Sequence, residues 1–313
     1  KSFNDSANAG LTAAHDKFGI TGRTVDSKSE SDYKTNLEAL AEGGATLVIG
    51  VGFAMLDSVK AASVKYPKVN FAIVDAVVDA PNVRSLVFKE EEGSYLAGYL
   101  AGETSKTGKI GFVGGMDTDL IKKFQYGYQA GALAANPKIQ ILPSKYVGDW
   151  VNVAVGKEMA KGMFDGGADI VYAAAGRAGL GVISAAKETG KYAIGVDSDQ
   201  DDLEKGAVLT SMIKRVDTAV LDTIGSVVDK SFEGGTKVYD LKANGLALSD
   251  MRNTKDAIGA DKIKALDAVK ADIISGKVIV PATEAQYKDF VAARNAAPKA
   301  EAPTEKAVAP SKG

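Results

Sequence analysis

The stretch Ala168–Gln200, ADIVYAAAGRAGLGVISAAKETGKYAIGVDSDQ, decides the fold class of this chain. A largely apolar run at 169–175 ends in a glycine-rich turn that starts at Gly176, and small apolar residues then recur at helical spacing up to Gly190. A second apolar run leads into Asp197, so the pattern predicts strand, helix and strand. Two strands joined by one helix form a right-handed parallel crossover. Gly176 and Asp197 should therefore lie at the carboxyl ends of neighbouring strands, where open α/β sheets bind ligands.

The same alternation continues on both sides of this stretch. Strand-like runs separated by helical segments occur at 46–50, 70–78, 83–88, 139–147, 207–213 and 278–280, with a further one from Lys109. This pattern predicts an α/β protein with doubly wound parallel sheets. The run KTGK at 106–109 is expected to be the first connection between two halves of similar rhythm. Asn244-Gly245 predicts a hairpin between two short strands within 238–249.

The two ends of the chain differ from this rhythm. The chain starts at Lys1 in a polar, turn-like run, KSFND, with no strand before the first helix. Because a doubly wound domain normally begins with a strand, we expect a signal and a first strand to precede Lys1. Residues 295–313 are rich in Ala, Pro and Lys and lack aromatic residues, which predicts a disordered tail.

Composition argues against most kinds of catalytic site. The chain has no cysteine, which excludes disulfides, thiolate catalysis and cysteine-based metal sites, and His15 is its single histidine. No nucleophile–base pair and no metal-ligand cluster is visible, and no cofactor motif is present. A net charge of −2 gives no reason to expect nucleic-acid binding. No apolar run approaches the ~20 residues that span a bilayer. We therefore expect a binding protein rather than an enzyme.

Charged side chains at predicted strand ends are the first candidate ligand contacts. Asp75, Asp197 and Asp199 can each accept hydrogen bonds from a ribose diol or from purine N–H groups. The alternative for such residues is helix capping, which is the simpler role for Asp199, whereas Asp197 follows buried residues directly and is expected to bind. For Asp75 the two readings are evenly balanced. Lys214 follows a strand and could reach a ribose hydroxyl or pair with Asp197, although a lone lysine is solvated by default.

Aromatic and glycine residues in predicted loops are the second set of candidates. Phe3, Phe53 and Trp150 do not belong to a periodic apolar face, and stacking on a flat ligand ring would bury them. Their alternative is local packing of loops. Most glycines at strand–helix junctions serve turn geometry, but Gly176 is placed for a close approach of its backbone to a ligand. The glycines at 176–181, and those at 111–115 after the strand from Lys109, do not match a dinucleotide or phosphate-loop fingerprint, which argues against an oxidoreductase on the same fold.

Several runs taken together resemble one protein family. They are SFNDSANAGL at 2–11, VIGVGFAM at 48–55, FAIVDAVV at 71–78, EEGSYLAGYLAG at 91–102, GKIGFVGGMD at 108–117 and AIGVDSDQ at 193–200. Over roughly 2–290 the chain is similar to the basic membrane protein family, the purine-nucleoside-binding lipoproteins of bacterial ABC importers. The resemblance implies a type I periplasmic-binding-protein fold with two α/β lobes, a three-strand hinge and a ligand between the lobes. It also implies a lipid-modified cysteine before the start of this sequence.

The resemblance implies lobes that are discontinuous in sequence. The chain would cross back after Lys214 and again near Asn253. The first lobe would then comprise residues 1–107 and 215–252. The second lobe would comprise residues 108–214 and 253–294.

The family's motifs also imply the ligand contacts of the first lobe. Its DKSFN loop matches residues 1–4, so that Phe3 would form an aromatic wall and Asn4 a polar contact to the base; the leading Asp of that motif would precede Lys1. Its GxGF loop matches 50–53 and assigns Phe53. The aspartate of the FAIVD run matches Asp75.

In the second lobe the aromatic loop of the family matches Trp150. The glycine turn near the sugar matches Gly176, although Arg177 stands where a small residue is expected. The aspartate of GVDSDQ matches Asp197 and the lysine of MIKR matches Lys214, and these two residues would hold the ribose hydroxyls.

The resemblance finally implies a function in transport. A purine nucleoside would bind between the lobes and favour the closed state, which would dock on an ABC permease served by ATPase subunits. The protein would be lipid-anchored or periplasmic in the cell envelope. The alternative function is a ligand-sensing protein of the same fold that acts in signalling or regulation.

Overall fold

The stretch that decides the fold class folds as predicted. Strand β7 (Ile170–Ala174) is followed by the 3-10 turn η2 (Gly176–Ala178), helix α7 (Gly179–Thr189) and strand β8 (Tyr192–Asp197). Gly190 ends α7 in the left-handed conformation, with φ of 64°, a role that suits a residue without a Cβ. Strands β7 and β8 pair in parallel, so the predicted crossover unit is confirmed.

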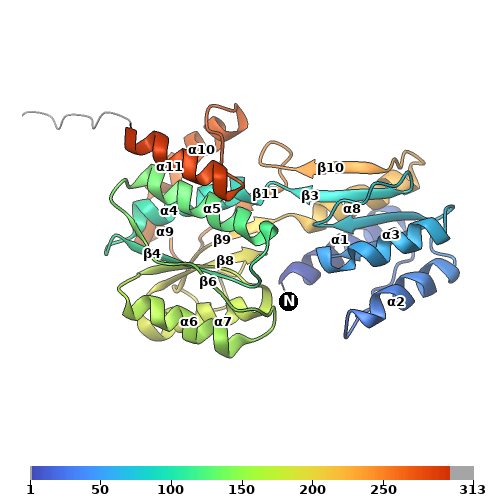
Figure 1. Ribbon diagram of the computed structural model, residues 1–313, viewed down its shortest axis with the longest axis horizontal. Coiled ribbons are helices and arrows are strands. Elements are labelled where there is room, and N and C mark those ends of the chain that lie inside the picture. Colours follow the sequence, from blue (N-terminus) through green and yellow to red (C-terminus); the bar gives the residue numbers. More distant parts are fainter. Residues whose placement is uncertain (1, 297–313) are drawn as a thin grey trace, which may run out of the picture.

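The computed structural model in Figure 1 describes residues 2–296, apart from the side chain of Ser2. Within these residues the strands form two separate sheets. The smaller sheet is parallel, with the order β1 (Leu47–Val51), β2 (Asn70–Val74), β3 (Val83–Phe88) and β10 (Gly235–Tyr239). The larger sheet has the order β11 (Leu246–Leu248), β9 (Val208–Lys214), β8, β7, β4 (Lys109–Gly114) and β5 (Gln140–Ile141), with β6 (Lys145–Tyr146) also on β4. Only β11 runs antiparallel to its neighbour in the described part of this sheet.

Helices cover both faces of the smaller sheet because alternate strand residues point to opposite sides. Ala72 and Val74 share one core with α1 (Ser2–Phe18) and α8 (Val216–Val228). Phe71 and Ile73 belong to the opposite core, with α2 (Ser31–Glu42) and α3 (Leu56–Lys65). A short 3-10 helix, η1 (Phe53–Met55), connects β1 to α3.

The larger sheet is covered in the same way. Phe112 and Tyr172 face the side of α4 (Glu90–Thr104) and α5 (Asp119–Ala135), whereas Val113 and Val171 face α6 (Val153–Asp165) and α7. Helix α10 (Ala260–Ile274) packs on α4 and helix α11 (Glu284–Ala296) packs on α5, on their side away from the sheet (Figure 1), and the short helix α9 (Lys255–Ile258) precedes α10.

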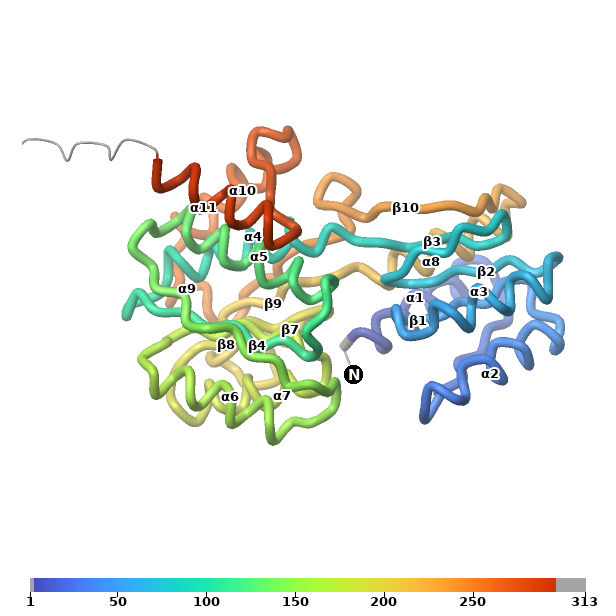
Figure 2. The backbone as a smooth tube through the Cα atoms, viewed as in Figure 1, coloured from blue at the N-terminus to red at the C-terminus, as the bar shows by residue number. Residues whose placement is uncertain are grey.

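The chain passes between the two sheets at three places, from β3 into α4, from β9 into α8 and from β10 into β11 (Figure 2). These crossings correct two of the expected positions. The KTGK run at 106–109 connects α4 to β4, and α4 packs on α5 beside the larger sheet. Strand β11 pairs with β9, so the last crossing precedes residue 246 instead of lying near Asn253. Residues 90–107 and 246–252 therefore lie with the larger sheet.

Other local expectations also differ from the structure. The hairpin at Asn244-Gly245 does not form: Asn244 adopts the turn conformation, with φ of 54°, but β10 pairs with β3 and β11 pairs with β9 in the other sheet. The strand expected at 139–147 is split into β5 and β6, with Pro143 between them, since proline has no N–H to donate. Residues 278–280 form no regular strand.

The predictions for the chain ends fall largely outside the described residues. Of the predicted tail at 295–313, residues 295 and 296 form the end of α11, and the rest lies beyond the part of the chain that the structure describes, as does any segment before Lys1. Among residues 2–296 no helix combines the length and the apolar character that crossing a membrane requires.

The close packing of α4 against α5 depends on glycines. A Cβ at Gly98 would overlap the backbone carbonyl of Tyr128, and a Cβ at Gly131 would overlap that of Tyr95. The two helix backbones therefore approach more closely than any side chain allows. Gly98→Ala should lower the free energy of unfolding by about 2 kcal/mol or more, because a backbone cannot yield as a side chain can.

Urea unfolding followed by circular dichroism measures this effect. Gly162 on α6 is the matched control, because beyond its chain neighbours and the nearby backbone of its own helix no atom lies within 4 Å of its Cβ position. Gly162→Ala should be neutral or gain about 0.5–1 kcal/mol from helix propensity. Equal stabilities of the two variants would contradict the packing argument.

A buried carboxyl group at the start of α4 makes stability depend on pH. Glu91 is 8% exposed, and its Oε2 has no hydrogen-bond partner among the described residues. Burial raises the pKa of Glu91 to about 7. In the unfolded chain the pKa of Glu91 is close to 4.5. Between pH 4.5 and pH 7 the folded protein therefore keeps a proton on Glu91 that the unfolded chain has lost. This contribution to stability is fully present below pH 4.5 and is lost as pH rises to 7.

Glu91→Gln should therefore gain stability relative to wild type as pH rises. The difference in free energy of unfolding should grow by about 3 kcal/mol between pH 4.5 and pH 8, from 1.36 kcal/mol per pKa unit. Urea titrations at several pH values measure it, with exposed Glu158→Gln on α6 as the reference for losing a surface carboxylate. A difference that stays constant with pH would contradict the shifted pKa.

Candidate functional site

The carboxyl ends of the two sheets meet at one ion pair. Lys214, the last residue of β9 in the larger sheet, donates a hydrogen bond of 2.6 Å to Oδ1 of Asp75, which directly follows β2 in the smaller sheet. The side chains of both residues are buried, with exposures of 1% and 5%. This contact joins two of the predicted site residues that are 139 positions apart in the chain.

The buried ammonium group has a second ion-pair partner that the sequence did not indicate. Oε1 of Glu90 lies 2.9 Å from Nζ of Lys214, and Glu90 is completely buried. Lys123, on α5, lies 3.3 Å from the other carboxylate oxygen of Glu90. Removing charges from water costs several kcal/mol per ion, so such a group persists only when it is well paired.

Aromatic rings complete the surroundings of this lysine. The rings of Phe88, Phe3 and Phe124 have centroids 4.9, 5.4 and 5.7 Å from Nζ of Lys214. A desolvated cation over aromatic rings gains about 2 kcal/mol or more. Phe3 was predicted as a site residue in a loop; it lies in the first turn of α1, which begins where the two halves of the molecule meet (Figure 2).

The charges of this cluster shift one another's protonation. Burial raises the pKa of Asp75 to about 6, with Glu90 and Asp197 adding to the rise and Lys214 opposing it. Burial by itself would lower the pKa of Lys214, but the carboxylates of Asp75, Glu90 and Asp197 outweigh it and raise that pKa. The lysine therefore stays charged, whereas Asp75 can take up a proton in mildly acidic solution.

Two of the predicted aspartates have an unusual backbone conformation. Asp75 and Asp197 have φ of 68° and 67°, and only five non-glycine residues in the described part of the chain have positive φ. Such conformations cost free energy and persist where the surrounding structure imposes them, often at functional sites.

The loop after β8 is held by a buried hydrogen-bond network. Asp201 Oδ1 accepts hydrogen bonds from the hydroxyls of Ser249 and Ser211, at 2.7 and 3.2 Å. The side chain of Asp199 accepts from the backbone N–H of Asp201 and pairs with Arg252. No helix begins at this loop, so Asp199 does not have the capping role that was its alternative; it helps to hold the loop that follows Asp197.

The predicted aromatic residues of the two halves face each other. Phe53 begins η1 of the smaller sheet, and Trp150 lies in irregular chain after β6 of the larger one. Their ring centroids are 6.3 Å apart at an interplanar angle of 66°, an edge-to-face contact. The rings of Phe53 and Trp150 thus touch across the junction.

The remaining predicted residues have different surroundings. Gly176 has φ of 56°, but the position of a Cβ there lies 3.5 Å from Cε3 of Trp150 and 3.3 Å from its carbonyl oxygen. The indole ring therefore covers that face of Gly176 in this structure. Asn4 lies in the first turn of α1 with an exposed side chain.

The cluster contains residues that sequence reasoning missed. They are Phe88, Glu90, Lys123 and Phe124. Phe88 ends β3, so the strand-end argument that identified Asp75 could have found it. Glu90 lies in the first turn of α4, and nothing in the sequence distinguishes it from its two glutamate neighbours.

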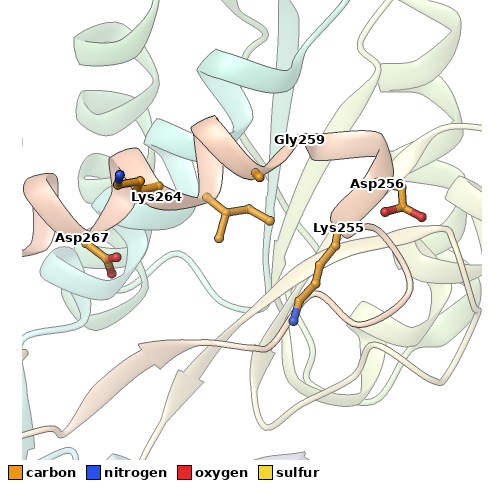
Figure 3. Close-up of a pocket in the computed structure, with 7 residues that line it drawn as sticks. Lys255, Asp256, Gly259, Lys264 and Asp267 are labelled. Atoms are coloured by element: carbon orange, nitrogen blue, oxygen red, sulfur yellow. The ribbon is translucent and has the colours of Figure 1, made fainter.

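A surface depression elsewhere is unrelated to these residues. It lies on α9 and α10 with a volume of about 620 Å³, and its lining includes Lys255, Asp256, Lys264 and Asp267 (Figure 3). Among the described residues no group of histidine, cysteine, aspartate or glutamate is arranged to hold a metal ion.

Comparisons with known proteins identify the family. The family model for "ABC transporter substrate-binding protein PnrA-like" matches residues 1–284. "Basic membrane protein A" of Borreliella afzelii is 37% identical over 299 residues, which are 93% of this chain and 90% of that protein. "ABC transporter nucleoside-binding protein BmpA" of Lactococcus lactis is 40% identical over 304 residues, which are 90% of this chain and 85% of that protein.

A solved structure supports the same conclusion on the fold. A solute-binding protein of an ABC transporter system from Aeropyrum pernix K1 superposes with a TM-score of 0.83 at 26% identity, over 94% of each chain. The predicted α/β architecture of a type I periplasmic binding protein is thereby confirmed. The expectation of a binding protein rather than an enzyme is also confirmed, because the family binds substrates for ABC transporters. The chain belongs to the PnrA-like family of ABC transporter substrate-binding proteins, the family that its sequence motifs resemble.

Proposed function

We propose that this substrate-binding protein takes purine nucleosides, such as guanosine, inosine or adenosine, at the junction of its two sheets. The observation that carries the proposal is that two kinds of contact join the sheets: the ion pair of Lys214 with Asp75, on which the charge of Asp197 also acts, and the aromatic pair Phe53 and Trp150. A nucleoside combines an aromatic base with a hydroxylated sugar, and this junction offers both kinds of partner. The name of the Lactococcus lactis relative, a nucleoside-binding protein, agrees with this choice.

The charge balance of the cluster favours a neutral ligand with several donors. Two buried carboxylates, from Asp75 and Glu90, pair with the ammonium of Lys214, and the charge of the buried Asp197 also acts on it. Ribose hydroxyls donate to carboxylates, and hydrogen bonds to charged groups are worth about 1.5–3 kcal/mol each. In this proposal Asp197 and Lys214 hold the ribose, and Asp75 contacts the base.

The aromatic residues would hold the base. Phe53 and Trp150 come from different sheets and touch each other in this structure, so they must separate before a purine can stack between them. Phe3 and Asn4, at the start of α1, would contact the base from the side. In this proposal the backbone of Gly176 approaches the sugar beside the indole ring of Trp150.

The three chain crossings would act as the hinge for this movement. We propose that the smaller sheet with α1, α2, α3 and α8 forms one lobe, and that the larger sheet with its helices forms the other. A ligand that contacts both lobes binds the closed state more tightly than the open state, and this difference drives closure.

Substrate-binding proteins of ABC transporters act outside the cytoplasmic membrane together with permease and ATPase subunits. We further propose that a lipid group on a segment before Lys1 anchors this one to the membrane. The closed form would deliver its nucleoside to the permease, and ATP hydrolysis would take place on the ATPase subunits.

Calorimetric titration tests the ligand class and the role of Asp197. Guanosine, inosine and adenosine should bind the mature full-length protein, whereas cytidine and free ribose should bind at least 10-fold more weakly. Asp197→Asn keeps the size of the side chain and tolerates positive φ, so it removes only the charge. It should weaken guanosine binding by 10- to 100-fold, from the loss of charge-assisted hydrogen bonds.

Asp202→Asn is the matched control, since Asp202 lies in the same loop with an exposed carboxylate. The affinity of Asp202→Asn for guanosine should stay within a factor of two of the wild-type affinity. Binding of none of the nucleosides would refute the proposed ligand, and wild-type affinity of Asp197→Asn would refute the ribose contact.

Tryptophan fluorescence gives an independent test of stacking. Trp150 is the only tryptophan of the chain, so its emission reports on the junction alone. Guanosine should change the emission intensity in a saturable way, with the same dissociation constant as calorimetry. Phe53→Ala should weaken binding about 10-fold, in the range of a lost base-stacking contact. An emission that does not respond to a bound nucleoside would contradict contact with Trp150.

A further inference from the structure

The indole ring of Trp150 rests on a glycine at the end of a neighbouring strand. Gly115 directly follows β4, and a Cβ built on it would overlap Cε3 and Cζ3 of Trp150 and lie 3.2 Å from Cη2. Gly115 does not belong to the described glycines with positive φ. Its backbone would therefore accept an L side chain, and it is the ring of Trp150 that leaves no space for one.

Hydrogen bonds fix the backbone on both sides of this contact. The N–H of Gly115 donates to the carbonyl of Ala174 at 2.9 Å, and its carbonyl accepts from Gly148 at 2.8 Å. The carbonyl of Trp150 accepts from the N–H of Ala178 at 3.0 Å. Neither backbone can withdraw without losing these bonds, so any added atom at Gly115 must displace the ring itself.

The other neighbours of the ring determine what such a displacement would change. Cε3 of Trp150 lies 3.5 Å from the Cβ position of Gly176, and the ring meets Phe53 of the opposite sheet edge-to-face. A rotation of the indole away from Gly115 therefore alters its contact with Phe53. The position of the ring decides where an aromatic ligand can lie between the two sheets.

We propose that Gly115 is a positioning residue for ligand recognition: it provides the seat on which the indole of Trp150 is held opposite Phe53. The effect on ligand affinity rests on the proposed nucleoside function, whereas the placement of the ring does not. The three atoms nearest to a Cβ at Gly115 all belong to Trp150, so Gly115 acts through that ring.

Fluorescence of the ligand-free protein tests the placement directly. Gly115→Ala should shift the emission maximum of Trp150 and change its acrylamide quenching constant at least two-fold. Gly162→Ala, the open glycine on α6, is the matched control and should leave both values as in wild type. An unchanged emission and quenching constant in Gly115→Ala would overturn the proposal.

A double-mutant cycle with Trp150→Ala separates positioning from general packing. In the wild-type background Gly115→Ala should lower the melting temperature and weaken guanosine binding about 10-fold. In the Trp150→Ala background the same change should do neither, because the ring with which the new methyl group collides is absent. Equal losses in both backgrounds would show that Gly115 serves only the packing of its strand, and would overturn the proposal.

The same cycle remains decisive if one variant does not fold. Failure of Gly115→Ala alone, with a folded double variant, supports the collision with the indole. If both Gly115→Ala and the double variant with Trp150→Ala fail to fold, the proposed collision with the indole is overturned. If wild type binds no nucleoside while the fluorescence and stability cycle behaves as expected, the proposed ligand is refuted and the positioning role of Gly115 stands.

Discussion

The ion pair between Lys214 and Asp75 is the interaction on which the arrangement of the two sheets depends. Lys214 ends a strand of the larger sheet, and Asp75 follows a strand of the smaller one. The hydrogen bond of 2.6 Å between these two side chains therefore joins the two sheets. Neither charge could be buried by itself, because the free-energy cost of removing it from water exceeds the gain from any single weak contact. Glu90 and the aromatic rings around Nζ stabilise the lysine further. The same groups that hold the sheets together thus form the polar part of the candidate site.

The hydrophobic cores support this junction from both sides. Each sheet has helices on both faces, and alternate strand residues such as Ala72 and Ile73 supply the opposite cores. The packing of α4 on α5 is unusually close because Gly98 and Gly131 bring the helix backbones together. Since α4 begins with Glu90, this packing also fixes where that carboxylate stands relative to Lys214. Core packing and site geometry are therefore coupled through one helix.

The aromatic contact at the junction is of a different kind. Phe53 and Trp150 touch edge-to-face, and such a pair is worth about 0.5–1.5 kcal/mol beyond the area that it buries. This is small beside the cost of breaking a buried ion pair, so the rings can part more readily than the charged groups. A site that opens at its aromatic side while its polar side stays organised suits a protein that must take up and release a ligand.

The sequence by itself determined the α/β class, the crossover at 168–200 and the residue types of the site. These follow from local patterns: apolar periodicity, glycine turns, and charged or aromatic residues at strand ends. Asp75, Lys214, Phe53 and Trp150 were all identified from such positions, and the structure brings them together in pairs. The family followed from the order of the motifs along the chain.

Only the tertiary structure decided which partners these residues have. Lys214 pairs with Asp75 and Glu90, two partners that the sequence did not indicate, because distant segments of the chain meet at this point. The hairpin at Asn244-Gly245 failed for a related reason, since the strands on its two sides pair with different sheets. Contacts between distant segments depend on how two sheets are placed relative to each other. No local sequence pattern encodes how the two sheets are placed. Their placement depends on burial, ion pairing and close helix packing between segments that are far apart in the chain.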